Sequence, residues 1–424
     1  MTEPVPVVVL PESRVRLHDM AIRQDGDEWI TGRLDTRRFV ALPRAGAVAI
    51  ELFRAGHSID EATTRMAHTE GCVFDVLSFA QDLAALGFVA DIDGRPVSSA
   101  PPLPASFPRI RPEHARFALS PVFPVLFIGL MLVATVALAL RPDLLPSFHE
   151  LLWSSRGSAV LALSAGAGWS LVYVHELAHF ITARAAGVHA RIQLSTRLQF
   201  LIAETDISGI EFAPRRHRLT AYLAGMATNL SVAAVAVLIQ ATASPATTVH
   251  RILAATMVIA LMSLPFEFMV FMRTDVYYVL QDVLACRNLF GDGTAYARYL
   301  GNRVRHIIFG STTGTVDPSL GLPHHERRAV RIYSVVLVVG TALCLGVMAM
   351  FTVPADLTLI SRAVTRIGLG QSLITNLDSV VVLLILGSVH TAWVLTWWRR
   401  HRGWVACRRG RRRLRGAGHT AIGP

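Results

Sequence analysis

The sequence predicts a mainly α-helical, polytopic membrane protein with about six transmembrane helices, preceded by a small N-terminal α+β domain. Three observations lead to this fold class. Of the 424 residues, 52% are apolar and only 17% are charged, whereas about a quarter of the residues in soluble domains are charged. Apolar runs of about 20 residues, the length that crosses a bilayer, occur six times. The first 100 residues hold 10 Arg against 15 acidic residues, and the remainder holds 31 Arg against 15.

The acidic N-terminal part, residues 1–94, changes from strand-like to helix-like spacing along its length. β-Branched and aromatic residues favour short strands first, and helical spacing of apolar residues then takes over. Ser58 and Glu61 form the capping-box pattern that begins a helix. We expect strands over 15–22, 29–32 and 38–42, helices over 45–54, 58–66 and 73–86, and a closing strand from residue 88. Short strands, three helices and a wing-like strand indicate a winged-helix-like domain.

Residues 95–116 contain six prolines and no apolar periodicity. Proline-rich segments of this kind are stiff and extended. We therefore expect a tether that joins the N-terminal domain to the apolar remainder. A peptide held by that domain would then have a raised effective concentration near the remainder.

The expected membrane domain covers residues 117–398, and a basic tail covers 399–424 with nine Arg and no acidic residue. Arg is concentrated before the first span and after the second and fourth, so the positive-inside rule predicts a multi-pass cell-membrane protein with both termini cytoplasmic. The tail anchors this topology or, alternatively, binds anionic lipid head groups. Four widely separated cysteines and the lack of a signal-peptide pattern fit a cytoplasmic N-terminal domain. The expected spans are 117–140, 157–181, 219–243, 252–272, 332–353 and 379–398.

The strongest chemical signal is the HELAH segment near the end of the second span, which contains His175, Glu176 and His179. Residues four apart share one face of a helix, so the two imidazoles can bind one metal ion. This is the HExxH pattern of zinc peptidases, in which the Glu serves as general base. Ionisable groups in a span cost several kcal/mol unless they are paired, hydrated or ligated, so three within five residues need a shared reason. A water-filled gap without metal is the alternative.

A catalytic zinc ion needs a third protein ligand beside two imidazoles. Asp275 lies at the cytoplasmic end of the fourth span, on the same side of the membrane as the end of the second span that carries His175 and His179, and depth therefore favours it. Glu267, eight residues earlier, stays open as an alternative ligand. His390 in the sixth span is expected instead to hydrogen-bond inside the helix bundle.

These motifs resemble the site-2 protease family of intramembrane zinc metalloproteases, in particular its peptide zinc metalloprotease branch, over about residues 117–330. HELAH matches the family's first motif, TDVYYVLQD with Asp275 resembles its FDGYYLLSD-type motif, and LAGMATNL with Asn229 resembles its AGPxxN motif. The chain departs from the family at Val276, where a glycine is usual, and at Met226, where a proline is usual. The resemblance implies an intramembrane zinc endopeptidase with Zn²⁺ on His175, His179 and Asp275.

In this interpretation zinc activates a water molecule, and Glu176 takes its proton and later delivers that proton to the leaving amine. Residues 189–212 alternate in polarity and are rich in β-branched residues, which predicts a strand or hairpin. In the resembled family such a segment presents the substrate in extended form, although an ordinary loop would also fit the pattern. Asn229 is expected to bind substrate backbone or to hydrogen-bond between helices.

The N-terminal domain resembles the pyrroloquinoline quinone biosynthesis protein D-like domains, which recognise leader peptides of ribosomally synthesised, post-translationally modified peptides. The resemblance rests on GRLDTRRFVALPRAGAVAIELFRAGHSIDEA followed by DLAALGFV. Winged helices more often bind DNA, but a net charge of −5 over the first 100 residues argues against a nucleic-acid partner. A purely structural cap on the membrane domain is the other interpretation.

Together these patterns predict an endopeptidase that removes the leader from a modified precursor peptide. Two alternatives remain open. The protease could instead cut a membrane-bound regulator in regulated intramembrane proteolysis, or the HELAH cluster could bind an ion in a non-catalytic metal-binding transporter.

Overall fold

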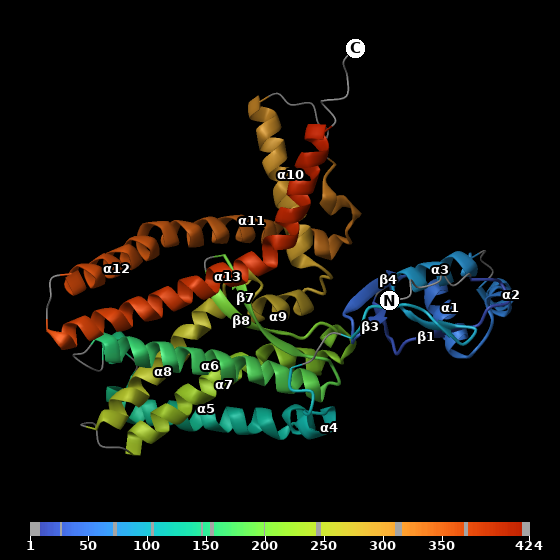
Figure 1. The fold of residues 1–424 in the computed structure, drawn as a ribbon. Helices are drawn as coiled ribbons and strands as arrows, with labels where there is room; N and C mark the ends of the chain where they lie inside the picture. Colours follow the sequence, from blue (N-terminus) through green and yellow to red (C-terminus); the bar gives the residue numbers. More distant parts are fainter. Residues whose placement is uncertain are drawn as a thin grey trace, which may run out of the picture. The chain divides into compact units, whose positions relative to one another are not determined.

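The computed structural model describes residues 9–25, 28–70, 74–102, 106–145, 147–152, 157–198, 200–242, 247–309, 316–368 and 372–417. The described residues form 13 α-helices and eight short strands (Figure 1). They divide into two compact units. The first consists of Met1–Phe117, Ala183–Arg191 and Asp206–Arg218, and the second of the remaining residues. Cys72, residues 103–105 of the expected tether and residues 418–424 of the expected tail lie outside the described residues.

The first unit contains two small antiparallel sheets. In one, β2 (Ala21–Asp25), β3 (Glu28–Arg33) and β4 (Arg38–Leu42) form a meander; in the other, β1 (Val15–Leu17) pairs with β5 (Val89–Ile92), which pairs with β6 (Arg95–Pro96). The single extended segment expected over 15–22 is therefore wrong, because it is two strands in different sheets. The break between them lets Val15 and Met20 both reach one hydrophobic core, where they are 3% and 4% exposed.

Three helices complete this unit: α1 (Arg44–Arg54), α2 (Ile59–Glu70) and α3 (Val76–Ala85). The predicted capping box at the start of α2 is confirmed. Ser58 Oγ accepts the backbone N–H of Glu61 at 3.2 Å, and Glu61 Oε2 accepts the N–H of Ser58 at 3.0 Å. The expected tether begins within strand β6 and ends in the short helix α4 (Pro112–Ala115), so it is not extended throughout. Side chains from all three helices and from β1 and β5 share the core, among them Ile50, Phe53, Ile59, Met66, Leu83, Val89 and Ile92.

A later stretch of the chain, residues 206–218, belongs to the same unit as the N-terminal sheets. The Arg37 guanidinium pairs with the Asp206 carboxylate, and the Phe39 and Phe212 rings lie 5.4 Å apart between centroids. Burial raises the pKa of the nearby Glu211 carboxyl, against the opposing charge of Arg23. This stretch thus packs on the meander through both charged and aromatic side chains.

The second unit holds the long apolar helices. Six helices of the described chain are long and apolar enough to cross a membrane, as the six apolar runs predicted. The first of them exposes Leu126, Ile128 and Leu132, each more than 60% exposed in the isolated chain. The last runs well past the expected sixth span into the basic tail. The six helices are α5 (Val122–Leu140), α6 (Gly157–Ala185), α7 (Arg215–Thr242), α8 (Thr248–Glu267), α11 (His324–Val347) and α13 (Leu373–Ala417).

Small side chains bring α6, α7 and α8 together. Their shared core contains Ala233, Ala236 and Ala260, all less than 5% exposed, beside Leu171 and Met257. Small residues at helix contacts let backbones approach closely, as is common between membrane helices. The residues of the expected metal site lie on these helices and on the segment that follows α8.

Shorter elements complete the second unit. A hairpin of β7 (Arg191–Arg197) and β8 (Phe200–Asp206) confirms the expected strand-forming segment. The helix α9 (Asp275–Val283) follows α8, and α10 (Leu289–Phe309) precedes α11. The helix α12 (Val353–Gly368) lies beside α13 (Figure 1).

Candidate metal centre

Helix α6 positions the two histidines of the HELAH segment. His175 and His179 are one turn apart, their ring centroids are 4.8 Å apart, and the rings meet at 69°. Both residues are buried, at 6% and 4% exposed. The four-residue spacing in a continuous helix therefore brings both imidazoles to one point, as the sequence predicted.

Asp275 reaches the same point from a separate element. The sequence placed Asp275 at the end of the fourth span, but α8 ends at Glu267 and Asp275 is instead the first residue of α9. Pro265 removes a backbone donor near the end of α8, and a short turn follows. The Thr274 hydroxyl donates to the Glu267 carbonyl at 2.6 Å, and the Asp275 N–H donates to Glu267 Oε2 at 3.1 Å. Glu267 thus holds the start of α9 in place.

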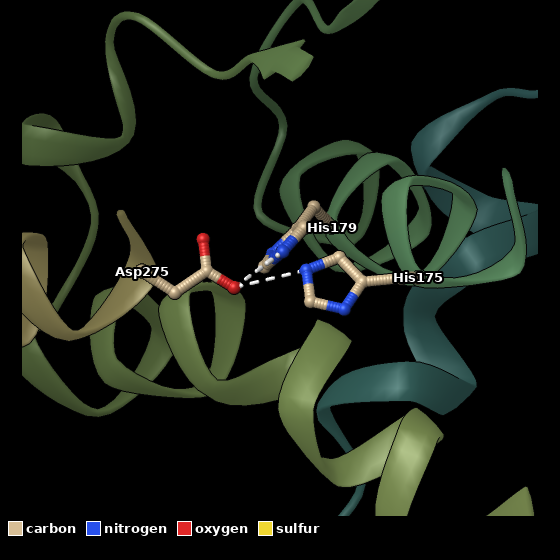
Figure 2. Close-up of side chains that lie close together, drawn as sticks. All are labelled: His175, His179 and Asp275. Carbon is tan, nitrogen blue, oxygen red and sulfur yellow. Dashed lines mark hydrogen bonds and ion pairs between the residues drawn. The ribbon is translucent and has the colours of Figure 1, made fainter. Parts of the chain in front are cut away.

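One carboxylate oxygen of Asp275 faces both rings (Figure 2). Asp275 Oδ2 lies 3.1 Å from His175 Nε2 and 2.9 Å from His179 Nε2. Burial raises the pKa of the Asp275 carboxyl, but the two imidazoles outweigh this effect and hold that pKa below its usual range.

The donor set fits a zinc ion. Ligand atoms of a tetrahedral zinc site, at zinc–ligand distances near 2 Å, lie about 3.3 Å apart, and the three candidate ligand atoms lie within 4.8 Å of one another. The contact from His179 Nε2 to Asp275 lacks hydrogen-bond geometry. Within the described part of the chain this buried nitrogen consequently has no hydrogen-bond partner. A metal ligand at this position would present the lone pair of this nitrogen to the ion.

Glu176 lies between the two histidines in the chain and is 8% exposed. Thr205, on strand β8, holds its carboxylate: the Thr205 hydroxyl lies 2.7 Å from Glu176 Oε2 and 2.9 Å from the Glu176 carbonyl oxygen, as a donor to both. The hairpin thus contacts the residue expected to act as general base. The sequence did not single out Thr205, because a threonine in a strand is ordinary and only the fold brings it to Glu176.

Helix α7 contacts the opposite nitrogens of the two rings. The Ala221 carbonyl accepts a hydrogen bond from His179 Nδ1 at 2.7 Å, and the side-chain amide nitrogen of Asn229 lies 3.3 Å from His175 Nδ1. Asn229 is 3% exposed and also donates to Ser263 Oγ at 2.8 Å. The substrate contact expected for Asn229 stays a prediction, whereas the hydrogen bond between helices is confirmed.

The other two candidate ligands differ in their placement. Glu267 lies beside Asp275 but accepts its backbone N–H, and the described group of ligand-bearing side chains is His175, His179 and Asp275. His390 lies elsewhere, 3.4 Å from Asp356 Oδ2, with its side chain 57% exposed. Its Nδ1 hydrogen-bonds to the Leu386 carbonyl of the same helix, and its Nε2 faces Asp356 of α12, so the expected hydrogen bond is present although the side chain is exposed.

Comparison with known proteins adds no relative to this description. No protein-family model, no curated protein and no solved structure matches the chain.

Proposed function

We propose that this protein is a membrane-embedded zinc endopeptidase of site-2 protease type. The observation that supports the proposal is the convergence of two buried histidines one helical turn apart with a half-buried aspartate, with a glutamate between the histidines in the chain. His175, His179 and Asp275 would hold the zinc ion. When bound there, zinc supplies Lewis acidity, which polarises a peptide carbonyl and acidifies a water molecule.

Glu176 is assigned the proton transfers. As a carboxylate it accepts the proton of the attacking water, and as the acid it returns that proton to the nitrogen of the leaving amine. The Thr205 hydroxyl limits the rotation of the Glu176 side chain, because it contacts both the carboxylate and the backbone carbonyl of that residue. Residues of the chain therefore provide both the proton acceptor and its orientation.

The membrane setting is part of the proposal. We assign the six long apolar helices to a cell membrane, with both termini cytoplasmic. Exposed leucine and isoleucine side chains on α5 support contact with a lipid bilayer, and the arginine-rich loops and tail support this orientation.

The proposed client is a ribosomally synthesised precursor peptide whose leader is removed. Residues 1–100 carry a net charge of −5, which disfavours nucleic acid, and β2 and β4 each pair only with β3 among the described strands. An extended peptide could add to such an edge by backbone hydrogen bonds. Genes for a short precursor peptide and for modifying enzymes nearby would support this client, whereas a nearby membrane-bound transcription regulator would support the alternative.

The decisive experiment replaces Glu176 by glutamine in the purified full-length protein. We expect Glu176→Gln to retain one zinc ion per chain, measured by elemental analysis, and to lose cleavage of a peptide library by at least about 100-fold, measured by mass spectrometry. Gln lacks the basicity to accept the proton but keeps the size of the side chain.

Glu113→Gln is the matched control, because Glu113 is exposed on α4 and should leave both readouts unchanged. Unaltered cleavage in Glu176→Gln would refute the mechanism. A wild-type chain that binds zinc and cleaves no peptide would instead favour a metal-binding transporter.

A further inference from the structure

One face of α7 contacts both imidazoles of the candidate zinc site. Ala221, Gly225 and Asn229 are spaced by four residues on this helix, so their positions lie on one face. His175 and His179 have the same spacing on α6. Ala221, the first of the three residues on α7, contacts His179, the second histidine on α6. Asn229, the last of the three, contacts His175, the first histidine. Gly225 lies between them and also adjoins His175.

The contact at His179 fixes the position of its proton. A backbone carbonyl only accepts hydrogen bonds, so the 2.7 Å contact with the Ala221 oxygen requires a proton on His179 Nδ1. In the neutral ring the lone pair is then on Nε2. That nitrogen is the one that faces Asp275, and it is therefore in the state that binds a metal.

At His175, Gly225 provides the space for the ring. A Cβ atom at position 225 would lie 2.3 Å from His175 Nε2 and 2.4 Å from its Cε1. Such distances are far below van der Waals contact, so any side chain at position 225 would displace the ring or separate the helices. The close approach of the α7 backbone thus sets the plane in which His175 can lie.

Asn229 contacts the other nitrogen of the same ring. Its amide nitrogen lies near both His175 Nδ1 and Ser263 Oγ, while its Oδ1 is buried and has no hydrogen-bond partner among the described residues. Turning the amide by 180° exchanges its oxygen and nitrogen and leaves its shape unchanged. The oxygen would then accept the Nδ1 proton of His175. The Ser263 hydroxyl, which donates to the Ala260 carbonyl at 2.7 Å, would rotate to donate its one proton to the amide oxygen instead. His175 would adopt the same tautomer as His179, with its Nε2 lone pair directed at the metal.

We propose that Asn229 is a positioning residue for the metal centre, whose amide oxygen accepts the Nδ1 proton of His175 and is supported by Ser263 of α8. This inference rests on the proposed zinc site. Zinc-bound histidines commonly donate their second ring nitrogen to an oxygen, and loss of that partner lowers metal affinity 10- to 100-fold. The same contact explains why a buried asparagine occurs in an apolar helix, where an unpaired amide would be costly.

The test measures zinc affinity rather than cleavage. Full-length wild type, Asn229→Leu, Asn229→Asp and Ser263→Ala are purified in detergent, and zinc is titrated against a chromophoric chelator. We expect Asn229→Leu to bind zinc about 10- to 100-fold more weakly. Asn229→Asp retains an acceptor for the His175 proton and should bind zinc nearly as well as wild type. Ser263→Ala removes only the support behind the amide and should have the smallest effect.

A second readout is the visible absorption of Co²⁺, which reports the geometry of the ligands. The Co²⁺ spectrum of Asn229→Leu should differ from that of wild type, because the His175 ring is no longer fixed. A role limited to joining α7 and α8 would predict a different pattern. Asn229→Leu and Ser263→Ala would then be equally less stable, and both would have wild-type zinc affinity and Co²⁺ spectra, which overturns the inference.

If Asn229→Leu does not fold, Gly225→Ala provides a second test of the inference. The added methyl group should weaken zinc binding by displacing His175, whereas Gly168→Ala, on α6 with open space around it, should not. Wild-type zinc affinity in Gly225→Ala, together with weakened affinity in Asn229→Asp, overturns the inference. Failure of the wild-type chain to bind zinc overturns the proposed function and this inference together. Binding by wild type with equal binding by Asn229→Leu overturns this inference alone.

Discussion

Buried ionisable side chains differ in their hydrogen-bond partners between the two units of the molecule. In the N-terminal unit Arg33 is 2% exposed, and its guanidinium makes hydrogen bonds to both oxygens of Asp35 and to the Gly87 carbonyl. In the second unit the buried His179 Nε2 has no hydrogen-bond partner among the described residues, although Asp275 lies 2.9 Å away. The buried guanidinium is thus fully paired within the chain, whereas one ring nitrogen of the second group has no hydrogen-bond partner in the part of the chain that the structure describes. A cluster of ionisable side chains that leaves a buried nitrogen in this state is typical of a functional site.

The largest effects on zinc affinity and on stability are expected when one aspartate in each unit is replaced by asparagine. Asp275→Asn removes the anionic ligand, and we expect zinc affinity to fall by more than the roughly 100-fold that loss of an outer partner can produce. Asp35→Asn leaves the buried Arg33 charge incompletely paired and should destabilise the N-terminal unit by about 2 kcal/mol, with zinc affinity unchanged.

Chelator competition measures the affinity, and hydrogen exchange of strands β3 and β4 measures the stability of the N-terminal unit. Equal zinc binding by Asp275→Asn and wild type would remove Asp275 from the ligand set. Glu267, which contacts the Asp275 backbone, would then be the next residue to replace.

Two threonine hydroxyls, one in each unit, allow a similar comparison with smaller expected effects. Thr205 donates to Glu176 in the second unit, and Thr31 donates to the Ala21 carbonyl at 3.1 Å in the N-terminal unit. Thr205→Val should lower kcat about tenfold, which corresponds to the 1.4 kcal/mol scale of one hydrogen bond, and should leave zinc content unchanged. Thr31→Val should cost about 1 kcal/mol of stability without affecting cleavage.

Thr205→Ser is the matched control, because serine keeps the hydroxyl and should retain most of the activity. A serine variant as slow as the valine variant would mean that the methyl group of Thr205, rather than its hydrogen bond to Glu176, matters for cleavage.

The sequence alone was sufficient for features that depend on local spacing. The HELAH spacing predicts that His175 and His179 share a helix face, and the structure places them so. The six apolar runs and the β7–β8 hairpin also correspond to elements of the fold. Local patterns succeed here because helix and strand periodicity determine which residues share a face, whatever surrounds them.

Contacts between distant segments were not predictable in this way. The Ala221 contact with His179 uses a backbone carbonyl, which carries no residue-specific signal. The place of Asp275 at the start of α9 depends on how Glu267 and Thr274 close the turn after α8. Asn229 was recognised by its motif, but only the packing of α7 on α6 shows that its amide meets His175. These contacts arise from helix packing, which one sequence does not specify.

The smallest expected effect concerns the pH dependence of the N-terminal unit. Hydrogen bonds from Arg33 lower the pKa of Asp35 below its usual range. A carboxyl whose pKa is lower in the folded state contributes stability above its unfolded pKa, near 3.9, and this contribution is lost as the pH falls through the folded value. Hydrogen exchange of β3 and β4 in wild type should therefore be much slower than in Asp35→Asn at pH 6, and the difference should shrink toward pH 3. Because the Asp35 side chain is 29% exposed, solvent screening limits the pH-dependent change to a small part of the effect expected for Asp35→Asn. A constant difference between the two proteins from pH 6 to pH 3 would show that the Asp35 charge does not stabilise this unit.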